Sequence, residues 1–338
     1  MIISRTPFRI SFFGGGTDYP AWYEAHDGQV LATTINKYCY ISCRYLPPFF
    51  EHKHRIVYSH IENVHRIAEI RHPAARACLQ FMRIRDGIEI HHDGDLPARS
   101  GIGSSSAFTV GLLHALYALD GKKPTRRQLA RNAIHIEQKM LKEHVGVQDQ
   151  MLTAFGGLNV VHFGGKRHLQ IRPIALPAHR TASLQKHLML FFTGVPRISS
   201  EIAQEQVKKT RSRARELKMM CELTTEALAV LASRRGIDEF GRLLHENWLL
   251  KRSLSDKISN HQIDDIYAEA RRGGAVGGKI LGAGGGGFIL LFAGPEVQPE
   301  IRKRLRKLLH VPFGFEDSGS RIVVAGPMDG SLREPRRR

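Results

Sequence analysis

The segment from Leu96 to Ala107, LPARSGIGSSSA, constrains the fold of this chain more than any other segment, because it predicts a tight turn followed by a helix. Gly101 and Gly103 permit backbone conformations that a β-carbon would forbid. The apolar run after them, AFTVGLLHALYAL, is typical of a buried helix that ends near Asp120. Free N–H groups at the start of this helix, its dipole and three serine hydroxyls would together favour a bound phosphate.

This turn matches neither of the two common phosphate-binding motifs. No Lys follows the glycines in the G-x-x-x-x-G-K-[ST] register, and the spacing is not G-x-G-x-x-G. A Gly/Ser turn before a helix is also common as a simple amino-terminal cap. The segment alone leaves both interpretations open.

Length and composition favour an ordinary globular protein of about two domains, since 42% of the 338 residues are hydrophobic and 24% are charged. No apolar run is long enough to span a bilayer, and the first residues lack the features of a signal peptide, so we expect a cytoplasmic protein without a membrane partner. We place the domain boundary between Pro173 and Leu184. The expected parts are an amino-terminal domain over 1–178, a carboxy-terminal domain over 179–330 and a basic, disordered tail over 331–338.

The formal charge of +18 raises the question of a nucleic-acid partner. Two of the basic clusters, at 208–217 and 302–309, alternate with apolar residues as helix faces do, and a third lies at 333–338 in the tail. No aromatic residues are interleaved with them, so we expect no specific nucleic-acid partner. The same positive field would attract anionic small molecules such as ATP and sugar phosphates.

A second glycine turn ends the first predicted strand, which covers residues 2–13 and is broken at Pro7. Its sequence, Gly14-Gly15-Gly16-Thr17-Asp18, would let the backbone approach a ligand closely. Arg9 lies just ahead of the turn. Asp18, just behind it, could accept hydrogen bonds from two sugar hydroxyls or could cap the helical segment that follows.

Two further acidic residues follow the central helix. Glu137 lies on the apolar face of a helix that begins at Thr125, a face it shares with Leu129, Ala133, Ile136 and Met140. A buried carboxylate there needs a partner such as a metal ion, unless Glu137 lies at the margin of the face and reaches water. Asp149, between a turn and an apolar segment, could be a helix cap or a general base.

The third glycine-rich segment, 282–287, contains only one residue other than glycine. Such a run costs conformational entropy unless the backbone must pack closely against something. A last predicted strand, 321–325, is expected to close the second domain.

Three glycine-bearing segments in this order, with an acidic residue after the second, resemble the GHMP kinase family, which includes galactokinase and the homoserine, mevalonate and phosphomevalonate kinases. PFRISFFGGGTDYP resembles the first family motif, LPARSGIGSSSA the phosphate-binding second and KILGAGGGGFILLF the third. The resemblance covers nearly the whole chain. It implies an α+β protein with a ribosomal protein S5 domain 2-like amino-terminal domain, a ferredoxin-like carboxy-terminal domain and an active site between them.

The resemblance also implies roles for individual residues. Asp149 would face the acceptor hydroxyl, and Arg9 stands where several family members have a catalytic Lys or Arg. Ser105 and Glu137 would hold Mg²⁺. ATP would bind to the second motif, at Pro97, Arg99, Gly101, Ile102, Gly103, Ser104, Ser105 and Ser106. The acceptor would bind to the first and third motifs and to the acidic residue, at Gly15, Gly16, Thr17, Asp18, Asp149, Gly284 and Gly285.

Within the family, FFGGGTDYP, SGIGSSSAF, GVQDQ and GGKILGAGGGGF are most similar to sugar 1-kinases that act on D-glycero-D-manno-heptose 7-phosphate. That resemblance implies transfer of the ATP γ-phosphate to the anomeric C1 hydroxyl, giving the 1,7-bisphosphate. The alternatives are an L-fucose or galactose-like 1-kinase and a non-catalytic sensor that binds ATP and sugar. Arg5, Arg99 and Arg197 are candidates for binding the phosphate already on the substrate. The residues do not distinguish a monomer from a dimer.

Overall fold

Two long antiparallel strands, β1 (Ile2–Phe13) and β2 (Gly28–Tyr45), form the centre of the first sheet. The structure is a computed structural model and describes residues 1–165, 168–194 and 199–326; the expected tail over 331–338 lies outside them. Pro7 was expected to break β1, but the strand continues through it with a shift in register between Pro7 and Phe8. A bulge at this point accommodates the missing N–H of proline.

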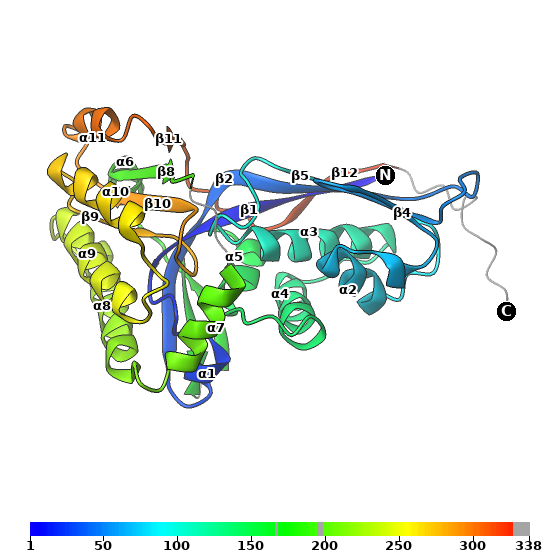
Figure 1. The fold of residues 1–338 in the computed structure, drawn as a ribbon, viewed down its shortest axis with the longest axis horizontal. Helices are drawn as coiled ribbons and strands as arrows, with labels where there is room; N and C mark the ends of the chain where they lie inside the picture. The colour runs from blue at the N-terminus through cyan, green and yellow to red at the C-terminus, as the bar shows by residue number, and fades with distance from the viewer. Residues whose placement is uncertain (166–167, 195–198, 327–338) are drawn as a thin grey trace.

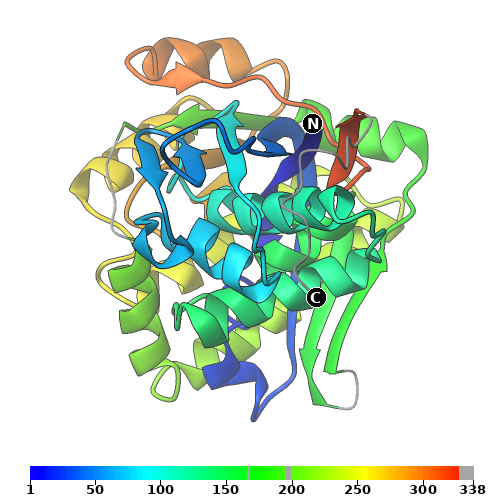
Figure 2. The same cartoon turned by 90° about the vertical axis from the view of Figure 1, so that its right-hand side faces the viewer.

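The remaining strands of the first sheet attach to this pair on both sides. Along one path the order is β12-β1-β2-β5-β3-β4, and β6 and β7 extend from the other half of β2. Figure 2 shows the β6–β7 hairpin to one side of the helices and β3, β4 and β5 to the other. The bounds are β3 (His54–Val57), β4 (Ile61–Val64), β5 (Ile88–Gly94), β6 (Asn159–Gly164), β7 (His168–Pro173) and β12 (Arg321–Ala325).

The expectation that the last strand closes the second domain is wrong. β12 pairs antiparallel with the start of β1, Ile2 opposite Ala325, and therefore belongs to the first sheet. The alternation of its side chains predicts a strand but carries no information about which free edge it pairs with.

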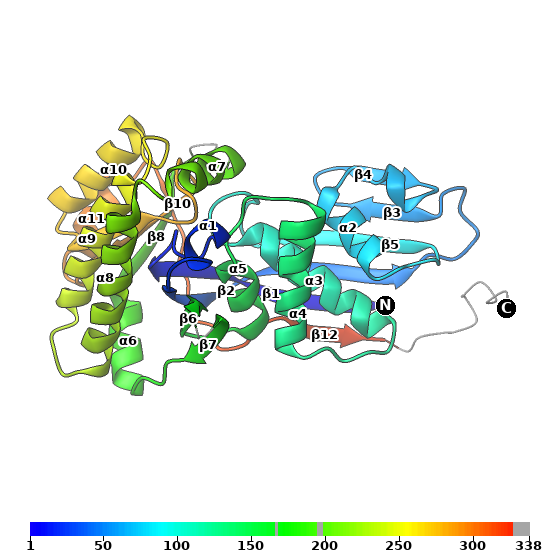
Figure 3. The same cartoon turned by 90° about the horizontal axis from the view of Figure 1, so that it is seen from below.

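The predicted central helix is confirmed as α3 (Ser104–Leu119), which packs across β1 and β2. It is buried along most of its length, as its continuous apolar run predicts. Figures 1 and 3 show α2 (Pro73–Phe81), α4 (Arg126–His135) and α5 (Gln148–Phe155) beside it. The cap expected at Thr125 is present, since its hydroxyl accepts a hydrogen bond from the backbone N–H of Gln128 at 3.1 Å.

The second sheet is antiparallel, with the order β11-β8-β10-β9. Numbered along the chain, this order is the ferredoxin-like arrangement 4-1-3-2, and it confirms the expected α+β class. The strands are β8 (Leu188–Phe192), β9 (Gly277–Ile280), β10 (Phe288–Phe292) and β11 (Leu309–His310). The helices not yet described are α1 (Pro20–Tyr23), which lies between β1 and β2 in the chain, and α6 (Ala178–Lys186), α7 (Ser199–Lys209), α8 (Ala214–Ala232), α9 (Asp238–Ser253), α10 (His261–Arg272) and α11 (Gln298–Arg304).

The two sheets share one continuous apolar core. Phe12 and Phe13, at the end of β1, contact the ring of Phe240 on α9 edge to face, with centroids 5.5 and 5.1 Å apart. All three residues belong to the same buried cluster. The end of β1, which leads into the first glycine turn, is therefore held by the second domain.

Two buried lysines of the second domain also donate hydrogen bonds to backbone carbonyls at the end of β1 and in the first glycine turn. Lys251 on α9 donates from Nζ to the Gly15 carbonyl and to Oε1 of Gln206, both at 3.1 Å. Lys279 on β9 donates to the carbonyls of Ser11 and Phe12 at 2.9 and 3.3 Å.

Burial lowers the pKa of both amines. Loss of hydration lowers the pKa of Lys251 to about 8 and the pKa of Lys279 well below its ordinary value.

We expect the free energy of unfolding of the wild type, relative to that of Lys251→Met, to rise with pH between about 8 and 10.5. In this window the unfolded chain binds the Lys251 proton more strongly than the folded chain does, so raising the pH favours the folded state. Across it, the wild type should gain on the order of 3 kcal/mol relative to the variant. Urea denaturation at a series of pH values measures this gain.

The control is Lys218→Met, which removes an exposed lysine of α8 and should follow the wild-type profile. Parallel profiles for the wild type and Lys251→Met would show that the buried amine does not titrate in this window.

Candidate active site

Arg9 and Asp149 form a buried bidentate ion pair where the first strand meets α5. Nε and Nη2 of Arg9 donate to Oδ1 and Oδ2 of Asp149 at 2.7 and 2.8 Å, and Nη1 donates to the Gly101 carbonyl at 2.5 Å. The Arg9 side chain is 3% exposed and that of Asp149 is 24% exposed. The guanidinium therefore fixes the orientation of the carboxylate, while part of the carboxylate still faces solvent.

The amino end of α3 lies directly against this ion pair. Gly103 precedes the helix with φ 74°, and no described side chain caps the first turn. A β-carbon at Gly103 would lie 3.2 Å from Cγ of Arg9 and 3.4 Å from Oδ2 of Asp149. The positive end of the helix dipole and the carboxylate thus border the same space, which fits the predicted phosphate site.

Hydrogen bonds within the second motif hold the turn before α3 in shape. The hydroxyl of Ser100 donates to the Pro97 carbonyl at 2.6 Å, and the hydroxyl of Ser104 accepts from the backbone N–H of Arg99 at 3.0 Å. The N–H of Arg9 donates to the Ile102 carbonyl at 3.0 Å and joins the turn to β1. The predicted nucleotide-binding residues therefore form an ordered turn and the first turn of α3 that follows it.

Glu137 is a buried carboxylate that is hydrogen-bonded to the first turn of α3. It is 1% exposed, and its Oε2 accepts hydrogen bonds from Ser106 Oγ at 2.9 Å and from Gln150 Nε2. Among the described residues its Oε1 has no hydrogen-bond partner. Burial raises the pKa of Glu137 to about 7. A buried carboxylate oxygen without a donor is a suitable ligand for a hard cation, so these residues fit Mg²⁺.

The expected burial of Glu137 is confirmed, but the local backbone departs from a regular α-helix. Residues Ile136–Met140 form a π-helical turn that continues α4, and its extra residue rotates the following side chains around the axis. Met140, expected on the buried face, is instead 37% exposed. The hydroxyl that bonds Glu137 comes from Ser106, whereas Ser105 is exposed at the start of α3. The pairing of Ser105 with Glu137 around a metal stays a prediction.

Asp18 organises the first glycine turn. Its Oδ1 accepts from the N–H of Gly16 at 2.9 Å and its Oδ2 from Nε2 of Gln148 at 2.8 Å. The side chain does not cap α1, whose amino-terminal cap is Tyr19. Burial, and to a lesser degree the charge of Asp149, raise the pKa of Asp18. The turn containing Gly15, Gly16 and Thr17 therefore lies next to the catalytic candidates.

The third glycine segment supports the second. The N–H of Phe288 donates to the Ser100 carbonyl at 3.1 Å, and a β-carbon at Gly287, where φ is 88°, would collide with that carbonyl. Gly284 and Gly285 pack against Ile258, whose carbonyl accepts from the N–H of Gly285 at 2.8 Å. The close packing predicted for this run is therefore present, but contact of Gly284 and Gly285 with the acceptor stays a prediction.

Several polar residues around the site were not predicted from the sequence to belong to it. Gln148 and Gln150 flank Asp149, and the motif GVQDQ contained that signal. Lys251 and Gln206 come from the second domain and lie in no motif, whereas Lys279 is the first residue of the third motif, KILGAGGGGFILLF. Among the phosphate-binding candidates, Arg5 lies over the ring of Tyr38 at 4.5 Å from its centroid, Arg99 is in the second motif, and Arg197 lies outside the described residues.

Other kinds of site receive little support from the described part of the chain. No three His, Cys, Asp or Glu side chains gather there in a way that could hold a metal ion. Cys39, Cys43 and Cys78 are buried and form no disulfide. No helix within residues 1–165, 168–194 and 199–326 has both the length and the apolar character needed to cross a bilayer.

Comparison with known protein families matches both halves of the chain. Residues 66–157 match the GHMP kinases N terminal domain, and residues 227–311 match the GHMP kinases C terminal domain.

Among characterised proteins, a D-glycero-alpha-D-manno-heptose 7-phosphate kinase of Campylobacter jejuni is 27% identical over 319 residues, covering 90% of this chain and 93% of that protein. A bifunctional fucokinase/GDP-fucose pyrophosphorylase of Arabidopsis thaliana is 27% identical over 67% of this chain and 22% of its own length. A mevalonate kinase of Thermococcus onnurineus is 26% identical over 72% of this chain and 71% of that protein.

Solved structures show the same fold. A D-glycero-D-manno-heptose 1-phosphate kinase of Bacteroides thetaiotaomicron superposes with a TM-score of 0.76 at 22% identity, covering 97% of this chain and 100% of that one. Lactococcus lactis galactokinase in complex with galactose has a TM-score of 0.73 at 16% identity, covering 95% and 94%. These matches confirm the expected fold class, and the domain bounds 1–178 and 179–330 stay a prediction. The chain therefore belongs to the GHMP kinase family, whose members are ATP-dependent phosphotransferases.

Proposed function

We propose that this protein is a sugar 1-kinase that transfers the γ-phosphate of ATP to the anomeric hydroxyl of D-glycero-D-manno-heptose 7-phosphate, giving the 1,7-bisphosphate. The observation that carries the proposal is the Arg9–Asp149 ion pair at the uncapped amino end of α3. The choice of acceptor is supported by similarity to the Campylobacter jejuni heptose 7-phosphate kinase over 90% of this chain.

Phosphoryl transfer asks a protein mainly to align the reactants and to stabilise negative charge on the transferred group. In the proposed reaction the first turn of α3 binds the ATP phosphates through its backbone N–H groups. Arg9, 3% exposed, supplies a permanent positive charge within this space and does not have to reorganise, because Gly101 and Asp149 already hold it.

Asp149 orients the acceptor hydroxyl and accepts its proton. Each carboxylate oxygen uses one lone pair on Arg9 and keeps another for the sugar. Asp18 and the glycine turn hold the ring beside it. Glu137, through its unpartnered Oε1, and Ser105 would hold Mg²⁺, which when bound neutralises charge on the β- and γ-phosphates.

The first test is ADP release with ATP and Mg²⁺ across five acceptors, namely D-glycero-D-manno-heptose 7-phosphate, sedoheptulose 7-phosphate, mannose, L-fucose and galactose. We expect turnover with the heptose phosphate alone. Turnover with free L-fucose would keep the catalytic roles and replace the acceptor. ATP binding without turnover on any sugar would favour a sensor and overturn the proposal.

Asp149→Asn should reduce kcat by about 10²–10⁴-fold, because the amide matches the carboxylate in shape but cannot accept the proton. Binding of a non-hydrolysable ATP analogue, measured by calorimetry, should persist. The matched control is Asp120→Asn, at the far end of α3, which should behave as the wild type. Near-normal turnover by Asp149→Asn would remove this residue from the mechanism.

Glu137→Gln should raise the Mg²⁺ concentration needed for half-maximal activity by about tenfold or more, because the negative charge of a carboxylate ligand contributes strongly to the affinity for a divalent cation. The amide oxygen can still accept from Ser106 and Gln150, so the variant alters chiefly the unpartnered position. Magnesium titrations of ADP release measure this. Glu222→Gln, an exposed change on α8, serves as the control, and an unaltered magnesium requirement in Glu137→Gln would argue against a metal at this carboxylate.

A further inference from the structure

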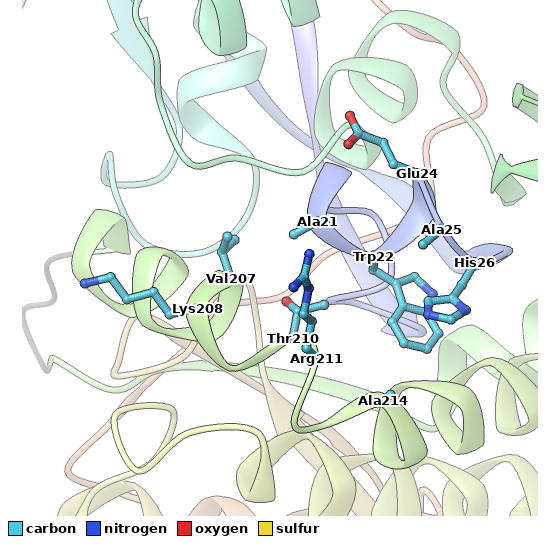
Figure 4. A pocket seen from close by; sticks show the side chains of 10 residues that line it. All are labelled: Ala21, Trp22, Glu24, Ala25, His26, Val207, Lys208, Thr210, Arg211 and Ala214. Carbon is cyan, nitrogen blue, oxygen red and sulfur yellow. The ribbon is translucent and has the colours of Figure 1, made fainter.

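A cavity of about 540 Å³ lies between α1 and the carboxy-terminal end of α7, outside the space between Asp149 and α3. Figure 4 shows the residues of both elements that line it, with the Arg211 side chain extending towards α1 and the Lys208 side chain extending outwards. Trp22, 4% exposed, forms part of its wall and is covered by the ring of His26, with ring centroids 4.3 Å apart. The rim carries Lys208 and Arg211.

The charges on this rim suit an anion. Neighbouring basic residues are neutralised, since Lys209 pairs with Glu205 at 3.0 Å and Arg213 pairs with Glu216 at 3.0 Å. Lys208 and Arg211 form no ion pair with any residue that the structure describes. Glu24 is the one carboxylate in the lining, so the cationic charges outnumber the anionic charge.

The cavity lies close to the first glycine turn. α1 begins two residues after Asp18, and Ala21, which lines the cavity, is at most about 11 Å from Asp18 along the chain.

From the other side, Gln206 precedes the cavity residue Val207 and packs against Gly16. A β-carbon at Gly16 would collide with Nε2 of Gln206. Gln206 is 4% exposed, and this Nε2 has no hydrogen-bond partner among the described residues. A buried amide donor without an acceptor therefore lies beside the glycine turn, on the residue that precedes the cavity residue Val207.

We propose that this cavity binds the phosphate monoester at the end of the acceptor opposite to its anomeric carbon. Lys208 and Arg211 pair with the phosphate, and Gln206 donates to a hydroxyl of the intervening sugar chain. The inference rests on the proposed function, because it assumes that the anomeric hydroxyl lies at Asp149. It explains how one site would select a phosphorylated acceptor over the free sugar.

Steady-state kinetics with heptose 7-phosphate and with the unphosphorylated heptose test the inference. In Lys208→Gln/Arg211→Gln, the ratio of KM for the phosphorylated acceptor to KM for the free sugar should rise about tenfold or more, as expected for loss of charge-assisted hydrogen bonds. The control Arg215→Gln/Lys218→Gln removes two exposed charges of α8 outside the cavity and should keep the wild-type ratio. A wild-type ratio in the cavity variant would overturn the inference and leave the kinase proposal standing.

A second measurement does not depend on turnover. Inorganic phosphate is titrated into the wild type with a non-hydrolysable ATP analogue already bound, and the fluorescence of the cavity residue Trp22 is followed; the chain has one other tryptophan, Trp248, which is fully buried. We expect a saturable change that the cavity variant loses and the control variant retains. If no sugar is phosphorylated but this response is present, the anion site stands and the proposed function falls. If the response is equal in all three proteins, the anion site falls.

Discussion

The ion pair between Arg9 and Asp149 is the interaction on which the arrangement of the candidate site depends. It joins the end of β1 to α5, and its third hydrogen bond reaches Gly101 in the turn before α3. A bidentate guanidinium–carboxylate contact fixes both partners in one plane. Because Arg9 is buried, its charge has to be compensated, and Asp149 provides that compensation while still facing solvent in part. One contact thus sets the position of a carboxylate, a cation and a helix terminus.

The second domain completes this site without contributing the ion pair itself. Lys251 and Lys279 donate hydrogen bonds to carbonyls of the glycine turn and of β1. The N–H of Phe288, which follows the third glycine segment, donates to the second motif. These contacts cross from one sheet to the other through a shared apolar core. The relative position of the two domains is therefore coupled to the shape of the first glycine turn, which is a physical reason for placing acceptor binding between them.

Much of the fold could be predicted from local pattern. The limits of α3 followed from its apolar run, and the cap at Thr125 from its spacing to Gln128. The predictions that failed concerned contacts with residues distant in sequence or irregular backbone. The alternation in 321–325 predicts a strand but not its pairing with β1. Helical periodicity correctly placed Glu137 on the buried face, but it does not reveal that a π-turn will expose Met140.

The candidate site was predictable where glycine and acidic residues form motifs, and less so where single polar residues converge from separate elements. Lys251 and Gln206 looked like ordinary residues of polar helices, and only the three-dimensional structure brings them to the glycine turn.

The most direct measurement is a crystal structure with a non-hydrolysable ATP analogue, Mg²⁺ and D-glycero-D-manno-heptose 7-phosphate. The account predicts that the anomeric hydroxyl lies within about 2.6–3.2 Å of an Asp149 carboxylate oxygen and in line with the γ-phosphate, which rests on the first turn of α3. An acceptor bound with its anomeric hydroxyl away from Asp149, or a nucleotide bound away from α3, would contradict it.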